Sequence, residues 1–376
     1  MNNEIGLYIH LPFCQKKCKY CDFPSYAGKE ELMLNYVNAL SIEMEHVQKY
    51  KIRTIYIGGG TPTYLSLEAL DILKDSVKKL NIAENCEFTI EGNPGTFKEK
   101  KLKILKDMGV NRLSIGLQSS NDDVLSYLGR IHNYNDFLDS FNMARKLGFE
   151  NINVDLMFGI PTYSLDMYLK TLDDVLKLNP EHLSCYSLIL EQGTEFYKLY
   201  KQGKFNIIDE DIDREMYEGT IEKLENHGYI QYEISNFSKK GKECKHNLKY
   251  WDLEDYIGVG ASSHSYFHNK RWSNVKSIEE YIERVNKKIE IYDFYKNNTM
   301  YDNIEEFIFL GFRKNNGISK VDFYNKFNKS IEEIYGDVLS NYISKALIIE
   351  DSDRLYLSRY ALEISNYILS DFILTR

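Results

Sequence analysis

The sequence predicts an α/β fold, a partial (β/α)6 barrel followed by a helical, winged-helix-like C-terminal domain. Six short apolar runs, each closed by Gly, Pro or a polar residue, alternate with helical patterns in the first half of the chain. Such alternation favours a parallel sheet with right-handed crossovers. The runs are continuously apolar, as in strands covered on both faces. A length of 376 residues suits a barrel with an appended region.

The barrel elements follow one another regularly. The expected strands are residues 5–11, 54–57, 86–90, 112–117, 152–157 and 182–190. The expected helices are residues 29–49, 66–80, 98–108, 122–128, 135–147 and 165–178. Ser66 stands directly before its helical pattern, and its side chain can accept a hydrogen bond from a free backbone N–H, so we expect it to be the N-cap.

We expect three domains: the barrel over 1–190, an extension over 191–298 and a small domain over 299–376. The extension begins with a polar helical stretch over 191–226. The last domain shows helical patterns followed by a hairpin pattern, which resembles a winged helix. These patterns are helices at 305–313, 320–327 and 331–345, a hairpin at 346–351 and 355–357, and a final helix at 361–373.

The charge balance limits the partners. Winged-helix shapes often bind nucleic acid, but a net charge of -9 disfavours that partner, so a lid or protein-binding surface is expected. No run of 18 apolar residues is present, so no integral membrane segment is expected. Residues 1–4 lack the pattern of a secretory signal. Clustered, unpaired cysteines fit a reducing compartment, so a cytoplasmic location is expected. The sequence leaves the oligomeric state open.

Three cysteines directly follow the first apolar run. Cys14, Cys18 and Cys21 form a C-x3-C-x2-C array, and the nearest other cysteine is Cys86. A structural zinc site normally has four protein ligands, and a disulfide framework is unusual in a chain of this length. Thiolates are the usual ligands of iron–sulfur clusters. The array therefore favours a [4Fe–4S] cluster with one iron left open, which S-adenosylmethionine (SAM) can occupy through its amino and carboxylate groups.

Polar and glycine residues stand at or near the ends of the expected strands, where barrel enzymes carry their active sites. The segment 58–62 reads Gly-Gly-Gly-Thr-Pro, and Glu91, Gln118 and Asp155 follow other strands. Glycine lets a ligand approach the backbone, because it has no Cβ. Each feature, and Arg130, also has a plain alternative: a turn, an ion pair or a group that satisfies the backbone. Their joint placement favours a binding site.

The cysteine loop and the strand-end segments resemble those of a known family. Residues 8–23 resemble the cluster loop of the radical SAM family, and more narrowly that of the oxygen-independent coproporphyrinogen III dehydrogenase group. The blocks at 58–62, 91–96, 116–119, 128–133 and 155–161 are similar to blocks of that group and occur in the same order. The resemblance extends over nearly the whole chain.

The resemblance implies roles for individual residues. The three cysteines, Cys14, Cys18 and Cys21, would bind the [4Fe–4S] cluster, and Tyr8, Gly59 and Glu91 would hold SAM on the open iron. In the dehydrogenase group a second SAM is held by residues that match Tyr20, Gly60, Thr61, Gln118, Arg130 and Asp155.

Two branches of this group imply different functions. The dehydrogenases carry an N-terminal extension and a further cysteine two residues after the third ligand, where this chain has Phe23. The segment 233–237 and the H-N-x-x-Y-W block at 246–251 are instead similar to the HemW haem chaperones. Residues 261–264 depart from the Gly-x-Gly-Ala-His that the chaperones more often carry. This resemblance implies a protein that binds haem, a [4Fe–4S] cluster and SAM, and transfers haem to an acceptor protein. The alternatives are radical decarboxylation of coproporphyrinogen III and radical SAM chemistry on an unrelated substrate.

A haem iron needs an axial ligand, which is commonly histidine. His246 and His264 are the candidates in this sequence. The alternative is that a histidine beside Trp and Tyr is simply packed and hydrogen-bonded.

Overall fold

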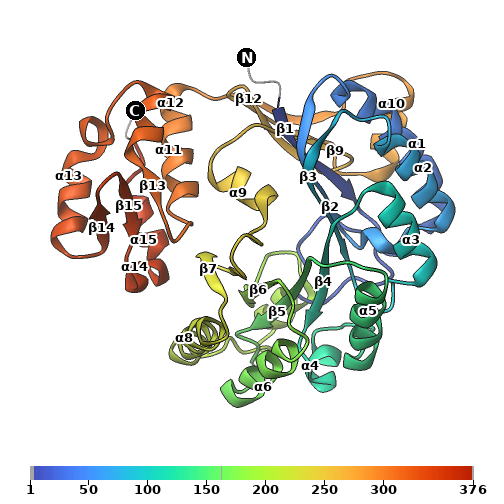
Figure 1. Cartoon of the computed structure of the whole chain (residues 1–376), viewed down its shortest axis with the longest axis horizontal. Helices are drawn as coiled ribbons and strands as arrows, with labels where there is room; N and C mark the ends of the chain where they lie inside the picture. The colour runs from blue at the N-terminus through green and yellow to red at the C-terminus, as the bar shows by residue number, and fades with distance from the viewer. Residues whose placement is uncertain (1–3, 162, 375–376) are drawn as a thin grey trace.

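The computed structural model describes residues 4–161 and 163–374. The other residues of the expected domains, 1–3, 162, 375 and 376, lie outside the described part. Within that part, one sheet of twelve strands runs through residues 4–297 (Figure 1). Its order is β12-β11-β10-β9-β1-β2-β3-β4-β5-β6-β8-β7, so the sheet ends in two edges and forms an open barrel.

Six parallel strands at the centre of the sheet confirm the predicted α/β barrel. Each pairs with the next in chain order. They are β1 (Glu4–Leu11), β2 (Lys51–Gly59), β3 (Ile82–Gly92), β4 (Arg112–Gln118), β5 (Ile152–Phe158) and β6 (His182–Ser187). The sixth strand ends at Ser187, three residues before the predicted position, although the N–H of Leu188 still donates to the carbonyl of Phe158 at the end of β5.

The helices between these strands bury one apolar face against the sheet. They are α1 (Met33–Met44), α2 (Leu67–Val77), α3 (Glu99–Met108), α4 (Asp122–Tyr127), α5 (Tyr134–Lys146) and α6 (Leu165–Leu176). The predicted N-cap is confirmed, since the Ser66 hydroxyl accepts a hydrogen bond of 3.1 Å from the N–H of Ala69. The helix expected over 29–49 is α1 flanked by two 3-10 turns, Glu30–Leu32 and Glu45–Val47.

Residues 191–298 extend the same sheet at both edges. The strand β8 (Asn236–Ser238) pairs with β6, and β7 (Ile230–Glu233) pairs with β8. At the other edge β9 (Tyr256–Val259) runs parallel to β1. The strands β10 (His264–Phe267), β11 (Lys270–Asn274) and β12 (Tyr292–Asn297) follow it.

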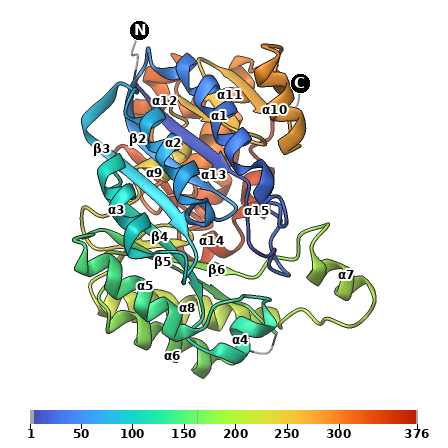
Figure 2. The same ribbon diagram turned by 90° about the vertical axis from the view of Figure 1, so that its right-hand side faces the viewer.

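The helices of this segment are α7 (Glu195–Lys201), α8 (Glu210–Asn226), α9 (Lys245–Trp251) and α10 (Ile278–Asn286). The polar helical stretch expected over 191–226 is thus two helices, separated by residues 202–209. The first of them, α7, projects away from the body of the molecule (Figure 2).

The C-terminal region has its own hydrophobic core. Its helices are α11 (Met300–Gly311), α12 (Lys320–Phe327), α13 (Ile331–Ser344), α14 (Arg359–Glu363) and α15 (Ser365–Ser370). Its sheet has the order β13-β15-β14, with β13 (Ile318–Ser319), β14 (Ile348–Asp351) and β15 (Arg354–Leu357). The predicted helices and hairpin are present, but the helix expected over 361–373 is divided into α14 and α15.

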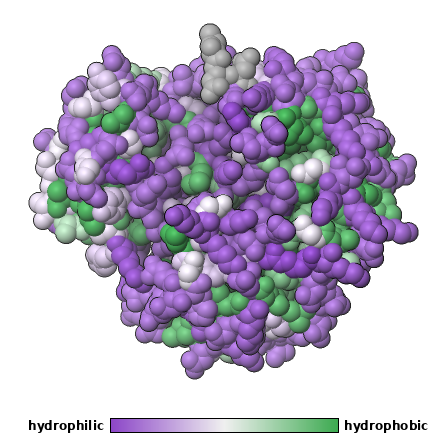
Figure 3. Space-filling view, in the orientation of Figure 1, coloured by the Kyte–Doolittle hydropathy of each residue, from purple (hydrophilic) through white to green (hydrophobic). Residues whose placement is uncertain are grey.

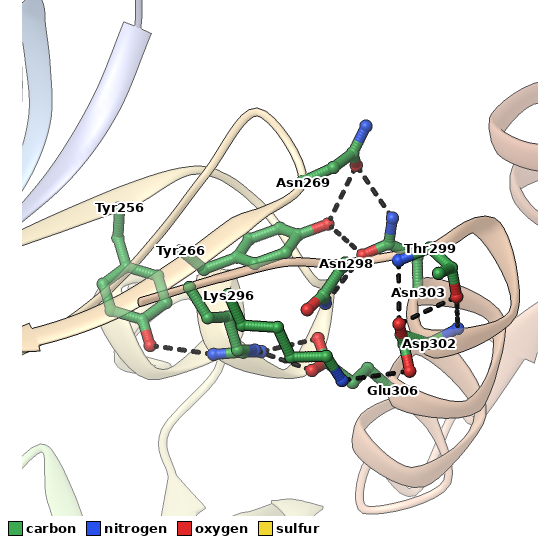
Figure 4. Close-up of polar contacts among 10 residues, drawn as sticks. Tyr256, Tyr266, Asn269, Lys296, Asn298, Thr299, Asp302, Asn303 and Glu306 are labelled. Atoms are coloured by element: carbon green, nitrogen blue, oxygen red, sulfur yellow. Dashed lines mark hydrogen bonds and ion pairs between the residues drawn. The ribbon is translucent and has the colours of Figure 1, made fainter. Parts of the chain in front are cut away.

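The C-terminal region lies beside the barrel, with α9 between them in contact with β2 and α11 (Figure 1). Polar contacts join the sheet to α11 (Figure 4). Arg271 of β11 donates hydrogen bonds of 2.7 and 2.8 Å to the two carboxylate oxygens of Glu306, and Tyr266 of β10 donates one of 3.0 Å to Asn303. A two-pronged guanidinium–carboxylate pair fixes orientation as well as distance, so these contacts set the position of α11 against the sheet.

The molecular surface carries mainly polar side chains. Figure 3 shows a largely hydrophilic face, with hydrophobic residues gathered in separate patches. Among the described residues, no helix combines the length and the apolar character needed to cross a lipid bilayer.

Candidate functional site

The loop that follows β1 carries the three clustered cysteines and is closed by its own backbone. The N–H of Cys14 donates to the carbonyl of Tyr26 at 2.9 Å, and the N–H of Tyr26 donates to Pro12 at 2.8 Å. Cys14 is buried, whereas Cys18 and Cys21 are partly exposed, and none of the three is in a disulfide. The loop therefore presents three free thiols close to the end of the first strand.

The chemistry of these thiols fits an iron–sulfur cluster. Burial raises the pKa of Cys21 to about 11, and the charges of Cys18 and Cys14 add to the increase. Burial likewise raises the pKa of Cys14, and Cys18 contributes again. A cationic iron core would relieve this mutual repulsion and hold all three as thiolates. In the described residues no three His, Cys, Asp or Glu side chains converge as they would around one metal ion.

A cavity of about 370 Å³ lies over this loop and brings most of the predicted site residues together. We call it the central cavity. Residues from the cysteine loop and from the ends of β2 to β5 line it, as expected for parallel strands whose carboxyl ends meet at one edge. The predicted residues on its wall are Cys14, Cys18, Cys21, Tyr20, Gly60, Thr61, Glu91, Gln118, Arg130 and Asp155.

The glycine segment packs directly on the cysteine loop. Gly59 has a φ of 115°, a left-handed conformation that favours glycine. A Cβ on Gly60 would lie 2.7 Å from the carbonyl oxygen of Phe13 and 3.0 Å from the sulfur of Cys14. The N–H of Thr61 also donates to Phe13, at 2.8 Å. Glycine at position 60 is therefore required for this close approach of the two segments.

Glu91 presents a carboxyl group that is easily protonated. Tyr56 donates a hydrogen bond of 2.7 Å to one of its oxygens, and the N–H of Gly59 donates one of 3.3 Å to the other. Burial raises the pKa of Glu91 to about 7, although the hydrogen bond from Tyr56 opposes the shift. A cationic amino group bound nearby would draw this carboxyl into its charged form.

Arg130 links the cysteines to the strand ends. It donates hydrogen bonds of 2.7 Å to Asn93 Oδ1 and 2.5 Å to the carbonyl of Gly116, and one of 3.4 Å to the sulfur of Cys18. Asn93 in turn donates to Thr61 at 3.0 Å. Asn93 is a site residue that the sequence analysis did not single out, although it lies within the block 91–96.

Asp155 lies deeper in the same cavity. It accepts hydrogen bonds of 2.7 Å from Asn153 and 3.2 Å from Ser114, while burial raises its pKa. Arg112 also lines the cavity and is fully buried, and its Nε has no hydrogen-bond partner among the described residues. Asn153 and Arg112 were missed because both stand inside strand patterns; the available signal was a polar side chain within an otherwise buried run.

A second cavity, of about 360 Å³, adjoins the first. We call it the aromatic cavity. Its wall comes from β1, the cysteine loop, α9, the β9–β11 strands and α11. Its lining includes Tyr8, His10, Phe23, Tyr250, Trp251, Tyr256, His264, Tyr266, Arg271 and Leu310. Phe23 lines both cavities. Tyr8 and Gly59, predicted to hold SAM, are not on the wall of the central cavity; Tyr8 lies here instead.

The two predicted haem ligands differ in their surroundings. His246 is fully buried; its Nδ1 is hydrogen-bonded to Thr54 and its Nε2 to Tyr250, both at 2.8 Å. Burial lowers the pKa of His246 to about 3. Both ring nitrogens are thus occupied in the protein itself. His264, the exposed first residue of β10, lies on the wall of the aromatic cavity.

Known proteins resemble this chain over nearly its whole length. The radical SAM superfamily model matches residues 8–175, and the HemN C-terminal domain model matches residues 299–363. The heme chaperone HemW of Bacillus subtilis (strain 168) is 41% identical over 372 residues, 97% of this chain and 98% of that protein. This chain belongs to the HemW family. The heme chaperone HemW of Lactococcus lactis is 35% identical over 374 residues, 98% of this chain and 97% of that one.

A solved structure supports the fold of this HemW-family chain. The coproporphyrinogen III oxidase HemN of Escherichia coli, titled a radical SAM enzyme, superposes with a TM-score of 0.85. The match covers 98% of this chain and 90% of that one, at 21% sequence identity. The radical SAM fold predicted from the cysteine loop and the strand-end blocks is therefore confirmed.

Proposed function

We propose that this protein is a haem chaperone that binds haem and transfers it to an acceptor protein. The observation that carries the proposal is the end-to-end identity of 41% with a protein named a heme chaperone. The aromatic cavity supports it, since an apolar aromatic wall with a few polar groups is typical of cofactor sites. The cytoplasm is the proposed compartment, because its reducing conditions would keep the six cysteines as thiols.

We further propose that Cys14, Cys18 and Cys21 bind a [4Fe–4S] cluster and that SAM binds in the central cavity. When bound, the pair supplies one-electron chemistry on SAM. The chain contributes the geometry: Glu91, held by hydrogen bonds from Tyr56 and from the N–H of Gly59, receives the amino group of SAM. Tyr8 and Gly59 are assigned to the same SAM by family resemblance. The assigned residues of a second SAM subsite are Tyr20, Gly60, Thr61, Gln118, Arg130 and Asp155.

We also propose that the chain is divided into a barrel over 1–190, an extension over 191–298 that continues the barrel sheet, and a C-terminal domain over 299–376. The shared sheet supports treating the first two as one folding unit. The separate hydrophobic core and the HemN C-terminal domain match over residues 299–363 support the third.

The proposal is tested with protein purified and reconstituted without oxygen. We expect haem to be taken up in a fixed stoichiometry and passed to a haem-free acceptor, apomyoglobin serving as the probe. The same preparation is incubated with coproporphyrinogen III and SAM. Sustained formation of protoporphyrinogen would instead identify the protein as a dehydrogenase, and SAM cleavage without any haem affinity would point to another substrate.

A further inference from the structure

We infer that haem binds in the aromatic cavity with His264 as an iron ligand, and that His246 is a positioning residue. The inference rests on the proposed haem-chaperone function and assigns that function a place in the fold.

The aromatic cavity has the chemistry that a porphyrin requires. A porphyrin is flat and largely apolar, with carboxylates at one edge, and aromatic side chains offer it broad, flat contact surfaces. The volume of about 360 Å³ lies within the range of small-molecule sites. Its aromatic lining residues are Tyr8, Phe23, Tyr250, Trp251, Tyr256 and Tyr266.

The tyrosine hydroxyls of the cavity are engaged elsewhere. Each has a partner within the protein, so none is left to bind iron without the loss of a hydrogen bond. The pairs are Tyr8 with His10 at 2.9 Å, Tyr250 with His246 at 2.8 Å, Tyr256 with Arg271 at 3.4 Å and Tyr266 with Asn303 at 3.0 Å. The cavity is left with aromatic rings rather than with phenolic ligands.

Of the two histidines on the wall, only His264 has free ring nitrogens. His10 is hydrogen-bonded through Nδ1 to Tyr8 and through Nε2 to the carbonyl of Pro24 at 2.8 Å. The ring of His264 has no hydrogen-bond partner in the described residues. Partial desolvation and the positive charges of Arg271 and Lys276 lower its pKa. Both ring nitrogens of His264 are thus available, and imidazole nitrogen is a common metal ligand.

The cavity also carries a cation suited to a propionate. Arg271 lies on the wall, and its guanidinium is already paired with Glu306 of α11. Arginine can bind a second carboxylate beside the first, because its five N–H donors are spread over a planar fork. Leu310 of the same helix lines the cavity from the side of the C-terminal region.

His246 supports this cavity from behind. It links Thr54 of β2 to the hydroxyl of Tyr250, whose ring belongs to the cavity wall. Glu87 of β3 accepts hydrogen bonds of 3.0 Å from the N–H groups of Lys245 and His246, which fixes the start of α9. The H-N-x-x-Y-W block thus places its Tyr and Trp on the wall, while its His anchors the helix.

The test is a spectroscopic haem titration of the full chain and its variants. Wild type should show the absorption and resonance Raman signature of an imidazole-ligated iron. His264→Ala should lose that signature and at least about tenfold in affinity, and added imidazole should restore the signature. His246→Ala should keep the signature and lose no more than about tenfold in affinity. His227→Ala, on the exposed end of α8, is the matched control.

The outcomes separate this inference from the proposed function. A wild type that takes up no haem contradicts the proposed function. The assignment of His264 as iron ligand is overturned if His264→Ala keeps the imidazole signature, whether or not His246→Ala loses it. That result leaves the proposed haem-chaperone function in place. As a second measurement, Leu310→Trp should fill the cavity and reduce haem uptake, while the reconstituted cluster absorbance stays unchanged. Normal haem uptake by a folded Leu310→Trp protein, checked by circular dichroism, would place haem elsewhere.

Discussion

Tyr56 and Glu91, on the neighbouring strands β2 and β3, share a hydrogen bond of 2.7 Å at the wall of the central cavity. The bond opposes the effect of burial, yet the pKa of Glu91 is still raised to about 7. The folded protein therefore holds this proton more tightly than the unfolded chain does.

The contribution of Glu91 to the stability of the cofactor-free protein should fall as the pH rises from about 4.5 to about 7 and then level off. In this range Glu91 loses a proton more readily in the unfolded chain, so stability falls with pH. The contribution is at most ~3 kcal/mol, since one pKa unit corresponds to about 1.4 kcal/mol. Glu91→Gln should reduce the slope and be more stable than wild type at pH 8. Urea unfolding at pH 5 and pH 8 measures the free energy of unfolding of both proteins. An equal change with pH in wild type and Glu91→Gln would contradict the raised pKa of Glu91.

Each of Cys14→Ser, Cys18→Ser and Cys21→Ser should lose the visible absorbance of a reconstituted iron–sulfur cluster. A serine oxygen is a poor substitute for the thiolates that bind such clusters. Cys86→Ala is the matched control, because Cys86 is a buried cysteine on β3 whose thiol donates to a backbone carbonyl. Iron and sulfide analysis checks the result. A cluster that survives in all three serine variants would remove the basis of the proposed cofactor.

Gly60→Ala should destabilise the protein by about 2 kcal/mol and lower its cluster content, because the new Cβ meets the Phe13 carbonyl and the Cys14 sulfur. Gly336→Ala is the control: a Cβ there meets nothing within 4 Å, and the residue lies in α13. That change should leave stability unchanged or raise it by up to about 1 kcal/mol. Denaturant unfolding and iron analysis compare the two variants. Equal stability and equal iron content would contradict the close packing of Gly60 on the cysteine loop.

Arg130→Lys should lower the stability of the protein and its affinity for SAM, although the change preserves the positive charge. A lysine cannot make the parallel contacts that the guanidinium makes with Asn93, Gly116 and Cys18. Leaving such buried groups without partners costs about 2 kcal/mol. We expect this loss in urea unfolding, together with weaker SAM binding in calorimetry. Lys103→Arg, on the exposed face of α3, is a control for the exchange of cations.

The barrel could be predicted from sequence because its signals are local. Continuous apolar runs, terminal glycines and prolines, and the N-cap Ser66 all lie within the elements that they define. The pairing of β9 with β1 has no such signal, since it joins Gly6 to Tyr256 across most of the chain. The strand β12 was not predicted because all of its residues are exposed and show no buried alternation.

The site could be predicted in part, because the carboxyl ends of parallel strands meet at the same edge of the sheet. This rule brings Gly60, Glu91, Gln118 and Asp155 to one cavity without any knowledge of their side-chain contacts. Tyr8, assigned to SAM by family resemblance alone, lies on a second cavity, which β9 and its neighbours build on the other edge of β1. The sequence could not separate His246 from His264, because the burial and the hydrogen bonds of His246 depend on how α9 packs against β2 and β3.

The parallel pairing of β1 with β9 also bears on how the molecule is made. During translation β1 emerges first, yet its outer neighbour is complete only at Val259. Through most of synthesis the nascent chain therefore carries an unpaired strand edge, which invites association with other chains. Contacts between segments so distant in sequence also slow folding. The strand β1 thus leaves the ribosome long before the strand that encloses its outer edge.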